Sequence, residues 1–144
     1  EVDVRNRAKI LASLSHVVKA SDEDLNWIFS NNNPQDSAIK IIESGASLVI
    51  VTLGKKGAFA VNKKLEIVEV TANEIAVIDT IGAGDTFAAA LITQLLENSW
   101  INKNALENLS SDDLTEILTN CSMASAITCS RQGANPPHRH EVSW

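Results

Sequence analysis

Apolar residues recur with helical spacing at the start of the chain and then give way to a short apolar run. Residues 4–14 (VRNRAKILASL) place Ile10, Leu11 and Leu14 on one side, which predicts a helix. The run SHVVKA at 15–20 is too short for another helix and is typical of a strand. The predicted fold therefore opens with a helix and a strand.

Two polar segments then predict two helix starts. Ser21 precedes a group of acidic residues that suit the positive end of a helix, and we expect this helix to run to about Ser30. Pro34 is typical of the first position of a further helix, and Gly45 is expected to end it. The residues expected to face inward from this further helix are Ala38, Ile41 and Ile42.

The middle of the chain is typical of strands joined by tight turns. The continuous apolar run at 47–53 (SLVIVTL) predicts a strand covered on both faces. The turn at 54–57 leads into a strand at 58–61, and a second turn leads into an alternating strand at 65–70. A last short strand is expected at 76–78.

Two helices are predicted in the last part of the chain. A loop at 79–84 leads into a helix at 85–96 that is apolar nearly all round and is therefore expected to be buried. Ser110 or Ser111 caps a longer helix at about 112–130. Its expected core residues are Leu114, Ile117, Leu118, Cys121 and Ala124. The alternation of helices and strands predicts an α/β domain with a sheet between helical layers.

Composition narrows the function classes. The chain has 144 residues, 44% of them hydrophobic, so an ordinary core is available. It carries 12 Lys and Arg against 18 Asp and Glu, a net charge of −6. This balance argues against a general binder of nucleic acid or of anionic membranes, because such binders need clustered basic residues. No apolar run approaches a membrane span of roughly 20 residues and no signal peptide opens the chain, so we expect a cytoplasmic protein.

The ends and the cysteines suggest a piece of an intracellular protein. The chain starts at Glu1 without an initiator, its one methionine is Met123, and it stops at Trp144 after a Pro-rich turn. We therefore expect a part of a longer chain. Cys121 and Cys129 lie in one predicted helix with their Cα atoms about 12 Å apart, beyond disulfide reach. Free thiols in a reducing compartment are expected.

The segment 77–90 (VIDTIGAGDTFAAA) carries the most specific chemistry. A strand is expected to end there, two glycines let the backbone approach a ligand, and a helix follows at once. The amides of Gly82 to Asp85 would then form an anion site at the helix start. Asp85 is either an ordinary helix-start acid or a base that takes a proton beside a phosphate. The spacing fits neither the dinucleotide fingerprint nor the Walker loop.

The segment DTIGAGDTF at 79–87 resembles the D-T-x-G-A-G-D signature of the ribokinase-like (PfkB) carbohydrate kinases. Three more segments resemble this family in the same order: VKASDED at 18–24, VTLGKKGAF at 51–59 and SRQGANPP at 130–137. The variants look most like bacterial fructokinases. The resemblance implies a three-layer α/β/α ribokinase-like fold, here without its N-terminal half and lid. Residues 1–144 would be the C-terminal nucleotide-binding and catalytic portion of a single larger kinase domain.

The resemblance also implies roles for individual residues. Asp85 matches the family's catalytic base, which removes the proton from a sugar hydroxymethyl group. The anion hole would comprise Gly82, Ala83, Gly84 and the amide of Asp85. The residues matching the nucleotide-binding turn are Thr52, Gly54 and Gly57, and those matching the adenine rim are Ala134 and Asn135.

Cation sites are implied at two places. Asp24 would lie near magnesium, while Asp79 and the carbonyl of Ile81 match part of a monovalent-cation site. Ser21 stands where the family commonly has Asn, and Asp24 where it commonly has Glu. Lys19 and Ser21 either line the nucleotide or are solvated surface.

The function that follows is transfer of the γ-phosphoryl group of MgATP to a sugar hydroxymethyl group, with fructose or a similar sugar as acceptor. Potassium is a candidate activator, and a homodimer of the full-length protein is compatible with this reading. Alternative acceptors are a keto-deoxy sugar acid, ribose and a nucleoside. A non-catalytic nucleotide-binding regulatory module is a different alternative. His138 and His140 are either a two-histidine metal site or part of a polar loop, and the polar loop is the interpretation we favour.

Overall fold

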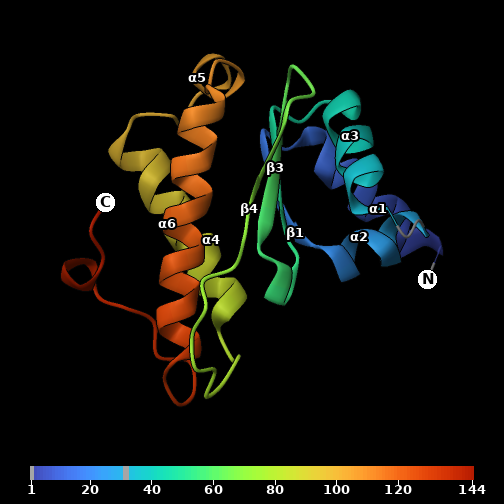
Figure 1. The fold of residues 1–144 in the computed structure, drawn as a ribbon. Helices are drawn as coiled ribbons and strands as arrows, with labels where there is room; N and C mark the ends of the chain where they lie inside the picture. The colour runs from blue at the N-terminus through green and yellow to red at the C-terminus, as the bar shows by residue number, and fades with distance from the viewer. Residues whose placement is uncertain (1, 31–32) are drawn as a thin grey trace.

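A sheet lies between two layers of helices in the computed structural model, which describes residues 2–30 and 33–144 (Figure 1). One layer comprises α1 (Val2–Leu14), α2 (Asp22–Phe29) and α3 (Pro34–Ser44). The other comprises α4 (Ala83–Glu97) and α6 (Ser111–Cys129), with the short α5 (Lys103–Glu107) at its end. The predicted α/β class and three-layer arrangement are confirmed.

The sheet has the order β1-β2-β3-β4. Its strands are β1 (Val17–Ser21), β2 (Leu48–Thr52), β3 (Ala58–Asn62) and β4 (Ile67–Val70). Strands β1 and β2 are parallel, and the pairs β2–β3 and β3–β4 are antiparallel. The register pairs Ser21 with Thr52, so the carboxyl ends of β1 and β2 meet at one edge. A 3-10 turn, η1 (Gly54–Lys56), follows directly.

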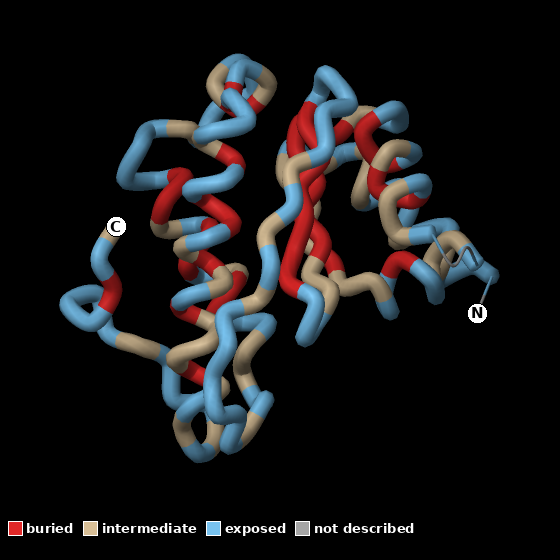
Figure 2. The backbone as a smooth tube through the Cα atoms, in the orientation of Figure 1, coloured by how far each residue is buried: buried red, intermediate tan, exposed pale blue. Residues whose placement is uncertain are grey.

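The apolar strand β2 separates two cores, as its sequence predicts. Leu48 and Ile50 pack under α4 and α6, whereas Val49 and Val51 pack under α2 and α3. Figure 2 shows the resulting band of buried backbone along the sheet and on the facing sides of the helices. The predicted inward residues of α3 and α6 are all buried. Because β2 is packed on both faces, the two cores hold its carboxyl end in a defined position.

Local capping follows the sequence closely. Ser21 and Ser110 each form a capping box at the start of α2 and α6. Pro34 occupies the first turn of α3, and the amide of Gly45 caps its end by donating to the carbonyls of Ile41 and Ile42. All of these signals come from residues within a few positions of the helix ends, which is why the sequence alone locates them.

Two expectations about apolar segments are wrong. Residues 76–78 form no strand; they belong to an exposed stretch tied to α6 by the amide of Ile78, which donates to the carbonyl of Cys129 at 2.8 Å. Without a neighbouring strand, this short run has no ladder to join. Helix α4 begins at residue 83 and is not covered all round, since Ile92 and Leu96 are 58% and 59% exposed.

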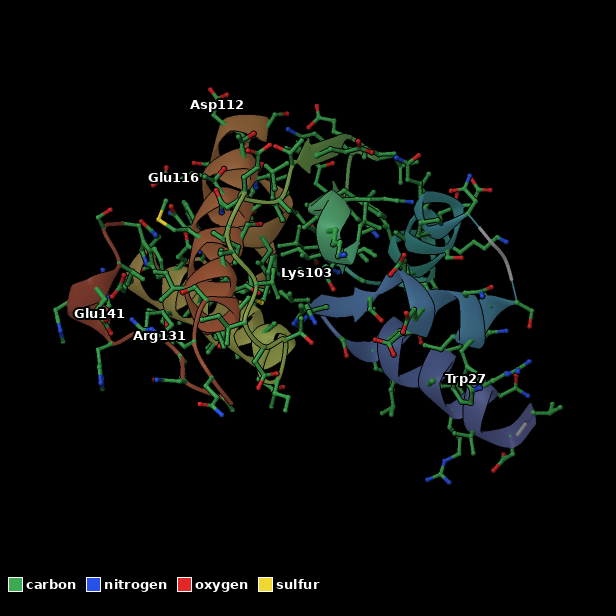
Figure 3. All side chains as sticks on the ribbon, turned by 60° about the horizontal axis from the view of Figure 1, so that its bottom comes forward. Trp27, Lys103, Asp112, Glu116, Arg131 and Glu141 are labelled. Carbon is green, nitrogen blue, oxygen red and sulfur yellow. The ribbon has the colours of Figure 1, made fainter. Side chains whose placement is uncertain are left out.

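Helix α1 forms where predicted but contributes no buried residue. Its apolar side chains Ile10, Leu11 and Leu14 are 57%, 66% and 76% exposed. The guanidinium of Arg5 instead lies 5.3 Å from the centre of the Trp27 ring on α2 (Figure 3). Helical periodicity places these residues on one side of α1, but it does not supply a surface for them to pack against.

No helix within residues 2–30 and 33–144 is long and apolar enough to cross a membrane. Both cysteines are free, with Cys121 buried and Cys129 half-buried, as their spacing predicts. Burial raises the pKa of the Cys121 thiol to about 12. The last residues fold back against α4 and α6, where the Arg131 guanidinium binds the Glu141 carboxylate at 2.5 Å (Figure 3).

Candidate active site

A cavity of about 310 Å³ opens where the carboxyl ends of β1 and β2 face the first turn of α4. Its walls come from the strand ends, the turn after β2, α4 and α6. The lining residues are Ser21, Asp22, Glu23, Thr52, Gly54, Gly57, Ala72, Ala83, Gly84, Phe87, Ser122 and Ser125. The fold therefore brings together four of the predicted nucleotide-site residues and parts of the predicted anion hole. They come from segments distant in sequence.

The strand ends present polar side chains toward α4. Alternation along β1 puts Lys19 and Ser21 on the same face as Val17, which packs in the core beneath α4 and α6. Thr52 is the register partner of Ser21, and its hydroxyl donates to the carbonyl of Ala20 at 3.4 Å. A cation and two hydroxyl groups therefore lie along one edge of the site.

The turn after β2 requires glycine at Gly57. Its φ is +107°, and a Cβ at this position would lie 2.0 Å from the carbonyl oxygen of Val70 on β4. The amide of Gly57 donates to the carbonyl of Gly54 and closes η1. This turn therefore keeps its backbone close against β4 and leaves the opposite side of the turn open to the cavity.

The first turn of α4 leaves two amides without a protein acceptor. The amide of Ala83 donates to the carbonyl of Thr80 at 3.2 Å, and that of Thr86 donates to the carbonyl of Gly82 at 2.9 Å. In the described part of the chain, the amides of Gly84 and Asp85 between them have no such partner. Free amides at a helix start favour an anion. Of the four amides predicted for the anion site, only that of Ala83 is used within the turn; among the described residues the amide of Gly82 also has no backbone acceptor.

Lys19 brings a positive charge to the same turn. A Cβ built on Gly84 would lie 3.4 Å from the Nζ of Lys19, so a larger residue there would crowd the ammonium group. Among residues 2–30 and 33–144, Lys19 forms no ion pair. A cation beside the positive end of a helix is unfavourable unless an anion lies between them. The arrangement is therefore that of a site suited to a strongly negative group.

Asp85 lies in the first turn of α4 with its carboxylate exposed. Its side chain accepts no hydrogen bond from the described residues, so it is neither a cap nor part of an ion pair. An ordinary helix-start acid would have the same exposure. Asp85 is not itself a lining residue; what distinguishes it is that it directly follows Gly84, which lines the cavity, and carries one of the two free amides.

Asp24, which the resemblance places near magnesium, is not among the residues that line the cavity. Its carboxylate accepts the amide of Ser21 at 2.9 Å, while its own amide donates to the Ser21 hydroxyl. These hydrogen bonds and the charge of Lys19 lower the pKa of the Asp24 carboxyl group. Asp22 and Glu23, which the sequence did not single out, line the cavity instead.

Asp79 joins the loop before α4 to the segment after α6. One carboxylate oxygen accepts the amide of Ile81 at 3.0 Å, and the other accepts the amide of Gly133 at 2.9 Å. These hydrogen bonds lower the pKa of the Asp79 carboxyl group. A Cβ on Gly82 would lie 3.0 Å from the Cβ of Ala134, so the two loops also touch.

The predicted adenine rim lies beside the cavity rather than in its wall. Ala134 and Asn135 are exposed, and neither belongs to the lining residues. Their position is set by the Asp79–Gly133 hydrogen bond described above.

The two histidines of the C-terminal segment stack on each other. The ring centres of His138 and His140 are 5.6 Å apart. The described ranges contain no group of three or more potential metal ligands from His, Cys, Asp and Glu.

Sequence reasoning missed the wall contributed by Phe87, Ser122 and Ser125. The serines lie three residues apart on α6, on one side of the helix. Small polar residues recurring at this spacing in a mainly apolar helix were a signal in the sequence. The sequence did not indicate that these serines lie beside Phe87 on α4, because the two helices are separated by more than a dozen residues of loop and α5.

Solved structures share this arrangement. Fructokinase with bound ATP from Xylella fastidiosa superposes with a TM-score of 0.79 at 22% identity, covering 90% of this chain and 41% of that one. A double mutant of fructokinase from Vibrio cholerae O395, in a fructose, ADP and potassium ion bound form, gives 0.76 at 23% identity, covering 92% and 40%. At these identities the likeness shows the fold, and the fold is ribokinase-like.

Curated relatives are also similar in sequence. A fructokinase from Rhizobium leguminosarum bv. trifolii is 36% identical over 103 residues, which is 72% of this chain and 31% of that protein. Fructokinase-2 from Solanum lycopersicum is 30% identical over 135 residues, 93% of this chain and 39% of the relative. The chain thus spans between 31% and 39% of the length of these two relatives.

The model of the "pfkB family carbohydrate kinase" matches residues 3–141. This range contains the strand ends, the turn after β2, the free amides of α4 and the loop after α6. Because the match extends over nearly all of its 144 residues, the chain belongs to the pfkB family of carbohydrate kinases.

Proposed function

We propose that this chain is the nucleotide-binding and catalytic portion of an ATP-dependent sugar kinase. The observation that carries the proposal is the first turn of α4, where two free amides, the ammonium group of Lys19 and the exposed carboxylate of Asp85 lie together. Donors and a cation suit a phosphoryl group, and a nearby carboxylate suits an alcohol that must lose a proton.

In the proposed reaction Asp85 accepts the proton of a sugar hydroxymethyl group as its oxygen attacks the γ-phosphorus of ATP. The bond from the γ-phosphorus to the bridging oxygen breaks, and ADP leaves. The amides of Gly84 and Asp85 hold the negative charge that gathers on the transferring group, and Lys19 adds a positive charge beside them. Positioning and electrostatics supply most of the rate in such transfers.

The nucleotide is proposed to lie along the cavity between the strand ends and α6. Thr52, Gly54 and Gly57 would face its phosphates, with Ser21 at the adjoining strand end. Ala134 and Asn135 would border the adenine from outside the cavity wall. In favour of this placement, the walls of the cavity expose backbone and small side chains that leave room for a ligand.

Magnesium is proposed to arrive with ATP. Mg²⁺ is commonly held by one or two carboxylates together with substrate phosphates and water. The residues present fit that pattern, because Asp22 and Glu23 line the cavity and Asp24 follows them at the start of α2. The ion would neutralise phosphate charge; Asp24 would hold the strand end through its hydrogen bonds with Ser21.

A monovalent cation is proposed beside Asp79 and the carbonyl of Ile81. The fructokinase of Vibrio cholerae O395 is described with a potassium ion, which supports this choice of ion. An ion there would stiffen the loop that precedes α4. We expect potassium to raise the activity of the full-length protein several-fold over tetramethylammonium at equal ionic strength, which keeps screening constant. Asp79→Ala should abolish the difference, and equal rates in both salts would refute the site.

Fructose is the proposed acceptor, because several relatives are named as fructokinases. Ribose, a nucleoside and a keto-deoxy sugar acid are alternative acceptors, and they are tested in the same assay as fructose. We further propose that the protein works in the cytoplasm, where its two free thiols would stay reduced. Its partners would be ATP and a small sugar, and it would bind neither nucleic acid nor membranes. A homodimer of the full-length protein is a further proposal, which a measurement of its mass in solution would test.

The test is an ADP-release assay on the full-length protein with MgATP and each acceptor. We expect turnover with fructose, and we expect Asp85→Asn to lower kcat by at least ~100-fold, the lower end of general-base contributions. Asp112→Asn, an exposed acid in the first turn of α6, is the matched control and should leave kcat unchanged. Equal turnover by the wild type and Asp85→Asn would show that Asp85 is only an acid at the start of a helix and not the base of the reaction. ATP binding without turnover for any acceptor would favour a regulatory module.

A further inference from the structure

Helix α6 holds the first turn of α4 through two polar contacts. The Ser125 hydroxyl donates to the carbonyl of Ala83 at 3.1 Å. The hydroxyls of Thr128 and Thr86 share a hydrogen bond of 2.9 Å, and both threonines are buried. Ser125 and Thr128 are three residues apart on α6, as Ala83 and Thr86 are on α4. The two contacts therefore follow one another along the helix pair, and we call them the rungs at Ser125 and Thr128.

Further along, the helices meet through apolar side chains such as Phe87 and Ala90. Two turns beyond Phe87, the buried Gln94 of α4 also donates to the carbonyl of Ile117 on α6 at 3.2 Å. Apolar burial is non-directional, so it tolerates small shifts of one helix along or around the other. Hydrogen bonds depend strongly on distance and angle and do not tolerate them. The hydrogen bonds of Gln94 fix the far part of the helix pair, whereas the rungs at Ser125 and Thr128 are the directional contacts at the first turn of α4.

That first turn carries the free amides of Gly84 and Asp85. We propose that Ser125 is a positioning residue, which orients these amides toward the cavity by fixing the peptide of Ala83 from the α6 side. The role in phosphate binding rests on the proposed function, whereas the role in ordering the turn does not. Ser125 also lines the cavity, so the residue that fixes the turn belongs to the wall on which a nucleotide would lie.

Ser122 offers a matched control. It lies one helical turn before Ser125, lines the same cavity and is likewise half-buried. Within the part of the chain that the structure describes, its hydroxyl makes no hydrogen bond to α4. Replacing either serine with alanine removes one hydroxyl from the wall, but only Ser125→Ala removes a contact with the Ala83 peptide.

The first experiment measures amide hydrogen exchange in this chain. The Thr86 amide, which donates to the carbonyl of Gly82, reports the order of the turn. We expect Ser125→Ala to speed its exchange by about fivefold, the factor that one neutral hydrogen bond is worth. Ser122→Ala should leave the rate unchanged, and Ser125→Thr, which restores a hydroxyl, should return it toward the wild-type value. An unchanged rate in Ser125→Ala would overturn the proposal whether or not the chain is part of a kinase.

The second experiment compares the binding of ADP and of adenosine by calorimetry. We expect Ser125→Ala to weaken ADP several-fold and to leave adenosine unchanged, because only ADP has phosphates for the turn to hold. Equal weakening of both ligands would make Ser125 a wall residue and overturn its positioning role. If the wild-type chain binds neither ligand, the proposed nucleotide site of this chain fails, and the exchange rates alone decide whether Ser125 orders the turn.

Discussion

Replacing Gly82 with alanine tests whether the loop before α4 is packed against the loop after α6. Gly82 is the residue before α4 and has φ +79° and ψ 0°, in the left-handed region. An alanine there costs about 1–2 kcal/mol in backbone conformation alone. Its Cβ would also lie 3.0 Å from the Cβ and 3.3 Å from the Cα of Ala134, closer than ordinary van der Waals contact.

Gly133→Ala separates these two costs. Gly133 has a similar φ of +69°, but a Cβ there would meet no atom within 4 Å. Its cost is therefore the conformational one, about 1–2 kcal/mol. Gly82→Ala adds an overpacking cost of about 1–3 kcal/mol, because the backbone of Ala134 must move. We expect Gly82→Ala to lower the free energy of unfolding by about 2–5 kcal/mol.

Urea unfolding followed by tryptophan fluorescence measures both variants. Trp100 and Trp144 pack against the core under α4 and α6, so their emission reports the unfolding of that layer. Folded domains are usually stable by about 5–15 kcal/mol, so the smaller expected losses leave a measurable transition. Equal losses in Gly82→Ala and Gly133→Ala would show that Ala134 yields without cost and would refute the close packing of the two loops.

Two further predictions concern titration and thiol reactivity. The hydrogen bond from Arg131 lowers the pKa of Glu141 from 4.5 to about 2, so this group stabilises the fold above about pH 4.5 and loses that effect as the pH falls toward 2. Glu141→Gln should therefore lower the melting temperature at pH 7 and converge with the wild type near pH 2, whereas the exposed Glu116→Gln should show no such convergence. Burial raises the pKa of Cys121 to about 12, so a disulfide reagent at pH 8 should label only Cys129 in the native protein. Cys129→Ser should then label only after unfolding, and rapid native labelling of both thiols would contradict the burial of Cys121.

Several elements could be predicted from the sequence because the residues that cause them are close neighbours along the chain. The apolar run of β2, the serine caps of α2 and α6 and the proline start of α3 each depend on neighbours a few residues away. The segment 79–87 also predicted an anion-binding helix start, because glycine spacing and helix onset are local properties. Its assignment to a catalytic role remains a prediction.

Which distant groups meet at that helix start depends on tertiary packing and could not be predicted from the sequence. Lys19 lies beside Gly84 because the sheet places β1 opposite α4, and Ser125 reaches Ala83 because α6 packs along α4. The use of Asp24 as a cap rather than as a cavity residue depends on a choice between competing hydrogen bonds. Spacing along the chain carries no information about such contacts, since they are set by how the layers stack and by which polar groups remain unpaired afterwards.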